Sequence, residues 1–146
     1  MSRTKRVVTV ILKKNGRILI LKRSNKVSSF QGFWSGVSGG INEGETPAEA
    51  AIRELREETG VKATESDLIS TGETIVAEEG ENRWEVHPFL LEVADESIVL
   101  DWEHDSYRWI SPDELQDFRF VPRLDEVVES LLKTDRNGKT ATNKST

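Results

Sequence analysis

Apolar residues in the first third of the chain fall into short runs with strand-like character. The β-branched runs Val7–Leu12 and Ile18–Leu21 are separated by Asn15-Gly16, and Asn-Gly is a strong signal for a two-residue β-hairpin turn. Both runs are almost continuously apolar, which is typical of strands covered on both faces of a sheet. The segment Ser24–Gly40 is rich in Ser and Gly, and we expect it to form a loop.

Three later runs predict further strands, at Leu68–Ala77, Trp84–Val93 and Tyr107–Ile110. The first two of them flank a polar, acidic loop at Glu78–Asn82. Pro88 cannot donate a hydrogen bond to a neighbouring strand, so we expect Trp84–Val93 to be an edge strand or to be bulged there.

The spacing of polar and apolar positions changes to a helical period after residue 45. Thr46 suits the N-cap, Pro47 the first helical position and Glu49 the third position of a capping box. We expect this helix to run to Thr59 and to stop at Gly60, which fits the C′ position.

A second helix start, with Ser111 as the cap and Glu114 three residues later, precedes a terminal amphipathic helix. The helical spacing of its apolar residues is seen at Leu124, Val127, Val128, Leu131 and Leu132. Strands with helices on both sides favour an α/β/α sandwich. We expect one domain over residues 1–132 and a disordered tail over 133–146, where Ala141 is the only apolar residue.

Composition limits the classes of site that the chain can build. It has 146 residues, a formal charge of −6 and no cysteine, which excludes disulfides and cysteine-based zinc sites. Two histidines, His87 and His104, argue against a metal site built from histidine. No apolar run approaches the ~20 residues of a membrane span, and the N-terminus lacks the apolar segment of a secretory signal. We therefore expect a cytoplasmic protein.

Charge is distributed unevenly along the chain. Residues 1–26 contain nine basic side chains and no acidic one, so the remaining residues are strongly acidic. A basic region can indicate nucleic-acid binding, but these charges flank two apolar strands without interleaved aromatic residues. Solvated strand ends are the simpler interpretation, and the acidic remainder would repel a nucleic-acid polymer.

Three carboxylates lie together on the predicted helix. Glu54, Glu57 and Glu58 are related by i, i+3 and i+4, and like charges at this spacing repel one another. One interpretation is a solvated helix face with Arg53 and Arg56 as counter-ions. The other is a site of oxygen ligands for a hard divalent cation such as Mg²⁺.

The residues around these glutamates favour the metal site. Upstream lies Gly39-Gly40-Ile41-Asn42-Glu43-Gly44-Glu45, a glycine-rich approach to the helix N-terminus. Such a turn lets the backbone approach a phosphate or a metal closely. From Gly39 to Val61 the chain matches the Nudix box, G-x5-E-x7-R-E-U-x-E-E-x-G-U with U aliphatic, at every specified position. The chain therefore resembles the Nudix family over about residues 5–132.

The resemblance implies a Nudix-type α/β/α sandwich with a mixed sheet and hydrolysis of a nucleoside diphosphate linked to another moiety. It also implies Mg²⁺ as the cofactor, with Mn²⁺ as the alternative. By position, Glu54, Glu57 and Glu58 resemble metal ligands, and Glu54 or Glu57 is alternatively the base that deprotonates water. The remaining assignments are Arg53 as the residue that orients the glutamates, Glu45 and Gly60 as structural box residues, and Gly39 with the Ser38 carbonyl as main-chain metal ligands.

One further acid outside the box fits the same resemblance. Glu103 precedes His104 in a Glu-His element that resembles dinucleoside-tetraphosphate and dihydroneopterin-triphosphate hydrolases. It is expected to act as a base or as an additional metal ligand, and a solvated loop acid is the alternative interpretation. His104 is more often a packing or hydrogen-bonding residue than a base.

Substrate contacts are expected from the second strand and from aromatic side chains. Lys22 and Arg23 close that strand near the expected position of the box, so they are candidates for phosphate binding, with exposed strand ends as the alternative. Among aromatic residues, Trp34 and Trp84 adjoin polar loops and are the first candidates for stacking a base, although most aromatic residues belong to cores.

The resemblance favours a small nucleotide as the substrate, either a nucleoside triphosphate or a dinucleoside polyphosphate. Segments outside the box resemble an archaeal Nudix group associated with initiation-factor-2B-related proteins, at Ser24–Val37, Trp84–Phe89 and Leu100–Ile110. The alternatives are a non-catalytic nucleotide sensor and a regulatory partner, but intact Glu54, Glu57 and Glu58 argue against the sensor. A homodimer is also consistent with the family.

Overall fold

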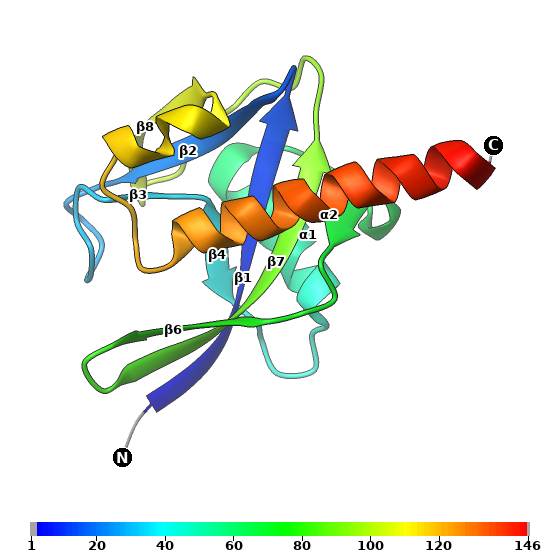
Figure 1. Cartoon of the computed structure of the whole chain (residues 1–146). Helices are drawn as coiled ribbons and strands as arrows, with labels where there is room; N and C mark the ends of the chain where they lie inside the picture. Colours follow the sequence, from blue (N-terminus) through cyan, green and yellow to red (C-terminus); the bar gives the residue numbers. More distant parts are fainter. Residues whose placement is uncertain (1–2, 146) are drawn as a thin grey trace.

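The computed structural model places a mixed β-sheet between two α-helices (Figure 1). It describes the backbone of residues 3–145 and the side chains of residues 4–136. The strands are β1 (Arg3–Lys14), β2 (Arg17–Arg23), β3 (Trp34–Ser35), β4 (Val37–Gly40), β5 (Leu68–Ser70), β6 (Ile75–Glu79), β7 (Asn82–Glu92) and β8 (His104–Ile110). The helices are α1 (Pro47–Thr59), α2 (Leu124–Ser145) and the 3₁₀ helices η1 (Glu65–Asp67) and η2 (Pro112–Asp117).

Two long parallel strands, β1 and β7, run side by side through the middle of the sheet (Figure 1). The other side of β1 pairs antiparallel with β2 near the hairpin and with β4 over Val7–Val10. Strand β2 diverges from β1 and pairs with β3 and β8. The gap between β1 and β2 is therefore occupied by the short strands that lead into α1.

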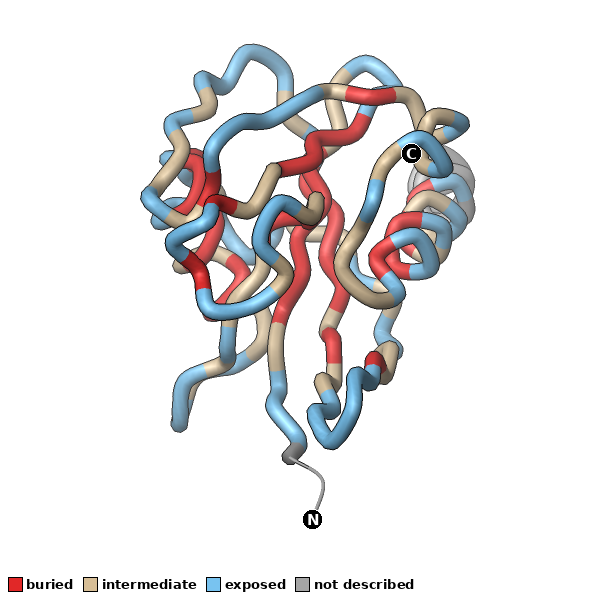
Figure 2. Tube along the Cα trace, turned by 90° about the vertical axis from the view of Figure 1, so that its left-hand side faces the viewer, coloured by how far each residue is buried: buried red, intermediate tan, exposed pale blue. Residues whose placement is uncertain are grey.

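The two helices cover opposite faces of the sheet, and each face has its own hydrophobic core. Val8, Val10 and Leu12 of β1 pack with the α1 residues Ala51 and Leu55. On the other face, Ile11 and Ile20 pack with Val128 and Leu131 of α2. Figure 2 shows the buried segments in the central strands and along the inner sides of the helices. The predicted α/β/α sandwich and the prediction of strands covered on both faces are confirmed.

The local signals of the hairpin and of the first helix are also confirmed. Asn15 and Gly16 have φ angles of 51° and 78°, as the two-residue turn between β1 and β2 requires. Thr46 Oγ1 accepts from the Glu49 N–H at 3.1 Å, and Glu49 Oε1 accepts from the Thr46 N–H at 2.8 Å. Gly60 closes α1 in the left-handed conformation at φ 76°. The helix start at Ser111 gives the short helix η2, which has its own capping box.

Two strand predictions need correction. Ser24–Gly40 is not a loop throughout, because β3 and β4 lie inside it. They are only two and four residues long, and pairing with β2 and β1 supplies their order. The predicted strand Leu68–Ala77 is two strands, β5 and β6, separated at residues 71–74 and both antiparallel to β7.

The prediction from Pro88 was wrong about the edge. Strand β7 is central, with β1 on one side and β5 and β6 on the other. On that second side the pairing skips His87 and Pro88, because β6 ends its pairing at Val86 and β5 begins at Phe89. The proline therefore occupies a stretch of β7, between β6 and β5, where no partner strand adjoins it on that side.

The terminal helix is longer than its apolar spacing indicates. Helix α2 runs to Ser145, whereas we expected no regular structure after residue 132. Lys13 Nζ of β1 lies 2.7 Å from Asp135 Oδ2, and the Asp135 side chain is 2% exposed. This ion pair joins α2 to the sheet beyond Leu132, the last residue of the apolar spacing, and the polar composition of this part of the chain does not reveal it. The division into one domain and a tail stays a prediction. Within residues 3–145, neither helix has the length and apolar character needed to cross a membrane.

Candidate active site

Helix α1 directs two of its three clustered glutamates into the protein. Glu54 and Glu58 are 8% and 1% exposed, whereas Glu57 is exposed. The buried pair faces β4, where Ser38 and Gly39 lie. The solvated helix face that we considered as an alternative therefore applies to Glu57 and not to Glu54 and Glu58.

Arg53 ties the loop before α1 to the glutamates of the helix. Its Nε and Nη2 donate to the two carboxylate oxygens of Glu45, each at 2.9 Å. Its Nη1 donates to Glu54 Oε1 at 2.6 Å and lies 3.4 Å from Glu57 Oε2. The Arg53 hydrogen bond and the Asn42 N–H lower the pKa of Glu45 to about 2. The hydrogen bonds to Glu45 likewise raise the pKa of Arg53 above its usual value.

Gly39 allows a carboxylate to lie against the backbone of β4. A Cβ atom at this position would come within 2.2 Å of the Glu54 side-chain carbon Cδ. The neighbouring Ser38 donates its backbone N–H to Glu58 Oε1 at 3.3 Å, and its Oγ lies 3.0 Å from Thr9 Oγ1. The glycine at the start of the box is therefore required by the space that Glu54 occupies.

Glu58 has an incomplete set of hydrogen-bond partners. Its Oε2 is buried without a hydrogen-bond partner, and a buried polar atom in that state is costly. Burial, followed by the hydrogen bond and charge of Glu54, raises the pKa of Glu58 well above its usual range. A cation among these carboxylates would offset both effects, so the arrangement fits a bound divalent metal ion.

A second segment brings Glu103 and His104 to the same place. The Ser24 N–H donates to the Glu103 carbonyl at 2.7 Å, and Ser24 Oγ donates to the Trp102 carbonyl at 2.9 Å. One ligand atom from each of Glu58, Glu103 and His104 lies within 4.8 Å of the other two. Burial and the charge of Asp101 raise the pKa of Glu103.

A cavity of about 340 Å³ opens beside these groups. Glu103, Ser38 and Gly39 line one side, and Lys5 and Arg23 contribute cationic side chains. The Arg23 guanidinium donates to the Ser29 carbonyl through Nε and Nη2, at 3.1 and 2.9 Å.

Two aromatic side chains line the same cavity. They are Phe30 and Trp84, whose ring centroids are 6.2 Å apart. A second hollow of about 340 Å³ shares Lys5, Ser29, Phe30 and Trp84, so the two hollows adjoin along this aromatic wall.

The structure does not bring all of the expected substrate contacts to this cavity. Arg23 and Trp84 line it, but Lys22 and Trp34 do not. Trp34 packs edge-to-face on Phe118 with the ring centroids 5.4 Å apart, as part of the core under α2. Lys22 lies one residue from Arg23 on β2, and the pairing of β2 with β8 is irregular between these two residues.

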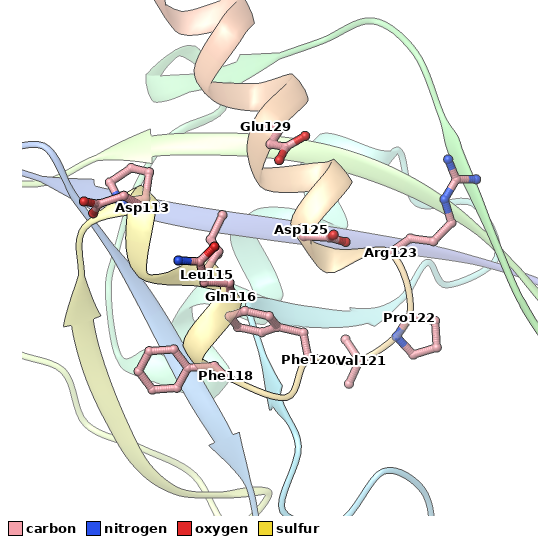
Figure 3. Close-up of a pocket in the computed structure, with 11 residues that line it drawn as sticks. Asp113, Leu115, Gln116, Phe118, Phe120, Val121, Pro122, Arg123, Asp125 and Glu129 are labelled. Carbon is pink, nitrogen blue, oxygen red and sulfur yellow. The ribbon is translucent and has the colours of Figure 1, made fainter.

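A larger hollow of about 630 Å³ lies away from the box (Figure 3). It is bounded by η2, by the segment that follows it and by the start of α2. Its lining combines apolar side chains such as Leu115 and Phe120 with charged ones such as Asp125, and it includes no residue of the box. Size alone therefore does not identify the reaction site.

Four residues that the sequence did not single out as site residues lie at or near the site, namely His104, Asp101, Ser24 and Lys5. His104 Nδ1 lies 2.9 Å from Asp101 Oδ1, and its Nε2 lies 3.7 Å from Glu58 Oε1. The position of His104 beside the box becomes apparent only in the folded sheet. There β2 pairs with β8, and Arg23 lies opposite His104. In the sequence, only the acidic residues next to His104, Glu103 and Asp105, indicated that this histidine could belong to a site.

Comparisons with known proteins agree with the box and with the fold. The family model of the NUDIX domain matches residues 2–131. A CTP pyrophosphohydrolase from Escherichia coli is 28% identical over 127 residues, covering 86% of this chain and 90% of the relative. An RNA pyrophosphohydrolase from Erythrobacter litoralis is 35% identical over 124 residues, covering 73% of this chain and 75% of the relative.

Among solved structures, a MutT protein from Methanosarcina mazei superposes with a TM-score of 0.78 at 23% identity, covering 94% of this chain and 97% of that one. This similarity shows a shared fold. Together with the family match over nearly the whole chain and the complete box on β4 and α1, it assigns the protein: the chain belongs to the Nudix family and is a hydrolase of phosphoric anhydrides.

Proposed function

We propose that the protein is a divalent-metal-dependent pyrophosphohydrolase that cleaves a nucleoside diphosphate linked to a further group. The observation that supports this most directly is the buried Glu58 carboxylate. Its Oε2 has no hydrogen-bond partner, and the carboxylate lies close to Glu54 and to Glu103. Glu103 in turn lines a cavity that also contains cationic and aromatic side chains.

The residues that would hold the metal come from three elements. Glu54, Glu57 and Glu58 lie on α1, the Ser38 carbonyl and Gly39 on β4, and Glu103 just before β8. All of these supply oxygen, which suits Mg²⁺, with Mn²⁺ as the alternative. When bound, a divalent ion neutralises charge on phosphoryl oxygens and makes water a stronger nucleophile at neutral pH.

The other residues of the site position these ligands and the substrate. Arg53 holds Glu54 and Glu57 in place while Glu45 fixes the arginine itself. Arg23 and Lys5 face the cavity and are suited to phosphate oxygens. Phe30 and Trp84 offer aromatic faces on which a base can stack. Glu103 is half-buried and faces the same cavity, so it is suited to accept a proton from the attacking water.

The proposed substrate is a nucleoside triphosphate or a dinucleoside polyphosphate. A cavity of about 340 Å³ lies in the range of small-molecule sites. The adjoining hollow beyond Phe30 and Trp84 adds room for the second moiety of a larger substrate.

The test is turnover of a panel of phosphoanhydrides with Mg²⁺ or Mn²⁺, with the products identified by mass. The panel contains nucleoside triphosphates, dinucleoside polyphosphates and other nucleoside diphosphate derivatives. We expect cleavage within the pyrophosphate chain, and the masses of the products report which bond breaks.

Glu57→Gln tests the assignment of the box. We expect it to lower kcat/KM by about 100-fold or more, because it removes a metal-site carboxylate. Glu43→Gln is the matched control, since Glu43 is an exposed carboxylate in the same loop. Unchanged turnover in Glu57→Gln for every substrate of the panel would contradict the proposed role of Glu57.

A further inference from the structure

We propose that the His104 imidazole is a metal ligand beside Glu58 and Glu103, and that this added nitrogen donor shifts the preference of the oxygen-ligand site from Mg²⁺ toward a first-row divalent transition metal such as Mn²⁺ or Co²⁺. The inference concerns the metal site of the proposed function. It is tested separately, because metal binding can be measured without any substrate.

The imidazole lies among the carboxylates and is closed off from solvent. His104 Nε2 is 3.7 Å from Glu58 Oε1, and the side chains are 2% and 1% exposed. With Glu103 they form a group whose ligand atoms lie within 4.8 Å of one another. At this spacing a single divalent ion can draw on all three side chains.

Asp101 sets which ring nitrogen is available. Its Oδ1 lies 2.9 Å from His104 Nδ1. An ionised carboxylate accepts hydrogen bonds and donates none, so Nδ1 carries the hydrogen. The lone pair of the neutral ring is then on Nε2, which is the nitrogen that lies toward Glu58. A carboxylate behind a histidine is the usual support of a metal-ligating imidazole.

The unpartnered Glu58 oxygen is an independent sign of a ligand. Glu58 Oε2 is buried without a hydrogen-bond partner, although Oε1 of the same carboxylate accepts from the Ser38 N–H. A buried carboxylate oxygen without a donor is suited to a cation. The acidic residues alone would suit any hard cation, and the nitrogen donor is what distinguishes this site.

The backbone of the Glu103–His104 segment is held by the end of β2. Ser24, which is 1% exposed, donates to the Glu103 and Trp102 carbonyls. His104 itself begins β8 and pairs with Arg23. Both proposed ligands therefore lie on backbone that is already fixed, which favours a preformed site.

The donor set determines the expected metal preference. Mg²⁺ binds oxygen ligands and keeps several waters. Imidazole nitrogen favours transition metals, and affinity rises from Mn²⁺ to Co²⁺. Replacing His104 should therefore reduce the affinity for Co²⁺ much more than the affinity for Mg²⁺.

The first measurement is pulsed electron paramagnetic resonance of the full chain with Mn²⁺ and no nucleotide. We expect modulation from a directly coordinated ¹⁴N of imidazole. The chain has one other histidine, His87, so the signal should persist in His87→Gln and disappear in His104→Gln. No imidazole nitrogen on Mn²⁺ in the wild type would overturn the proposal, whether or not the protein hydrolyses nucleotides.

The second measurement is calorimetric titration with Co²⁺ and with Mg²⁺. We expect His104→Gln to weaken Co²⁺ binding by about 10- to 100-fold and Mg²⁺ binding by less than about threefold. If His104→Gln does not fold, Asp101→Asn is the substitute variant. An amide can donate a hydrogen bond as well as accept one, so it no longer forces the hydrogen of the imidazole onto Nδ1. That variant should weaken Co²⁺ binding by about tenfold. Equal Co²⁺ affinities in wild type and variant would overturn the proposal.

The outcomes also separate this inference from the proposed function. Nitrogen coordination in a protein that cleaves no phosphoanhydride would support the ligand and contradict the function. Mg²⁺-supported hydrolysis without nitrogen coordination would leave the function in place and overturn the ligand.

Discussion

Among the described glycines, Gly39 leaves the least room for a side chain. Its ideal Cβ position lies 2.2 Å from Glu54 Cδ and 2.3 Å from Glu54 Oε1, so any side chain there must displace the carboxylate. Displacing a group of the site by about 1 Å can cost about 100-fold in rate. We expect Gly39→Ala to lower kcat/KM for the best substrate by about 100-fold.

Gly40→Ala is the matched control for this prediction. A Cβ at Gly40 meets no atom within 4 Å, so we expect at most a few-fold effect on kcat/KM. Thermal unfolding of both variants would separate a local effect from a loss of fold. Equal activities of the two variants would contradict the steric role of Gly39.

Single residues also show where sequence reasoning reaches its limit. The roles of Glu45 and Arg53 in the box follow a fixed spacing, and the structure joins them by two hydrogen bonds. Trp34 adjoins polar loops in the sequence as Trp84 does, yet it packs on Phe118 under α2. Which tryptophan faces the cavity depends on long-range packing, and no local pattern encodes that choice.

At the scale of elements, strong local signals predicted structure well. The Asn15-Gly16 turn and the capping box at Thr46 require particular residue types at fixed positions, and both are present as expected. Strands β3 and β4 lack such signals because their order comes from pairing with β1 and β2. The central position of β7 was missed for a related reason, since the gap that tolerates Pro88 arises between two other strands.

The ion pair of Glu45 and Arg53 joins the loop of the box to helix α1, and it should be visible in the pH dependence of stability. The pKa of Glu45 in the fold is about 2, below its ordinary value of 4.5. The ionised form is therefore stabilising at pH above about 4.5, and that contribution is lost as the pH falls toward 2.

Glu45→Gln removes this contribution. We expect it to lower the Tm relative to wild type at pH 7, and the difference in Tm should shrink as the pH falls from 4.5 toward 2. Scanning calorimetry of the two proteins at pH 7, 4 and 3 would measure it. The same profile in Glu43→Gln, an exposed carboxylate of that loop, would show that the effect is not specific to the ion pair.

On the scale of the whole molecule, the fold brings acidic and basic parts of the sequence to one place. The first 26 residues are basic, and the box contains six glutamates against Arg53 and Arg56. Strands β1 and β2 supply Lys5 and Arg23 to the cavity, the segment before β8 supplies Glu103, and Glu58 of α1 lies close to Glu103. A substrate with phosphate groups would thus meet cationic side chains and proposed metal ligands close to one another.

Because these carboxylates converge only in the folded chain, a bound metal should stabilise the whole molecule. A ligand that binds only the native state at 100-fold excess over its Kd contributes about 2.7 kcal/mol. For a chain of this length that corresponds to a rise in Tm of about 5–10 °C. We expect Mn²⁺ to produce such a rise in the wild type and EDTA to reverse it.

Glu58→Gln should abolish most of the rise in Tm that Mn²⁺ produces, because the neutral amide does not attract the ion as a carboxylate does. The variant alone should be no less stable than the metal-free wild type, since it removes a carboxylate that is buried beside Glu54 and lacks a donor for Oε2. The expected pattern is therefore a variant with an equal or higher Tm in EDTA and a lower Tm in Mn²⁺. An equal rise with Mn²⁺ in both proteins would place the stabilising ion elsewhere and contradict the assignment of Glu58 as a ligand.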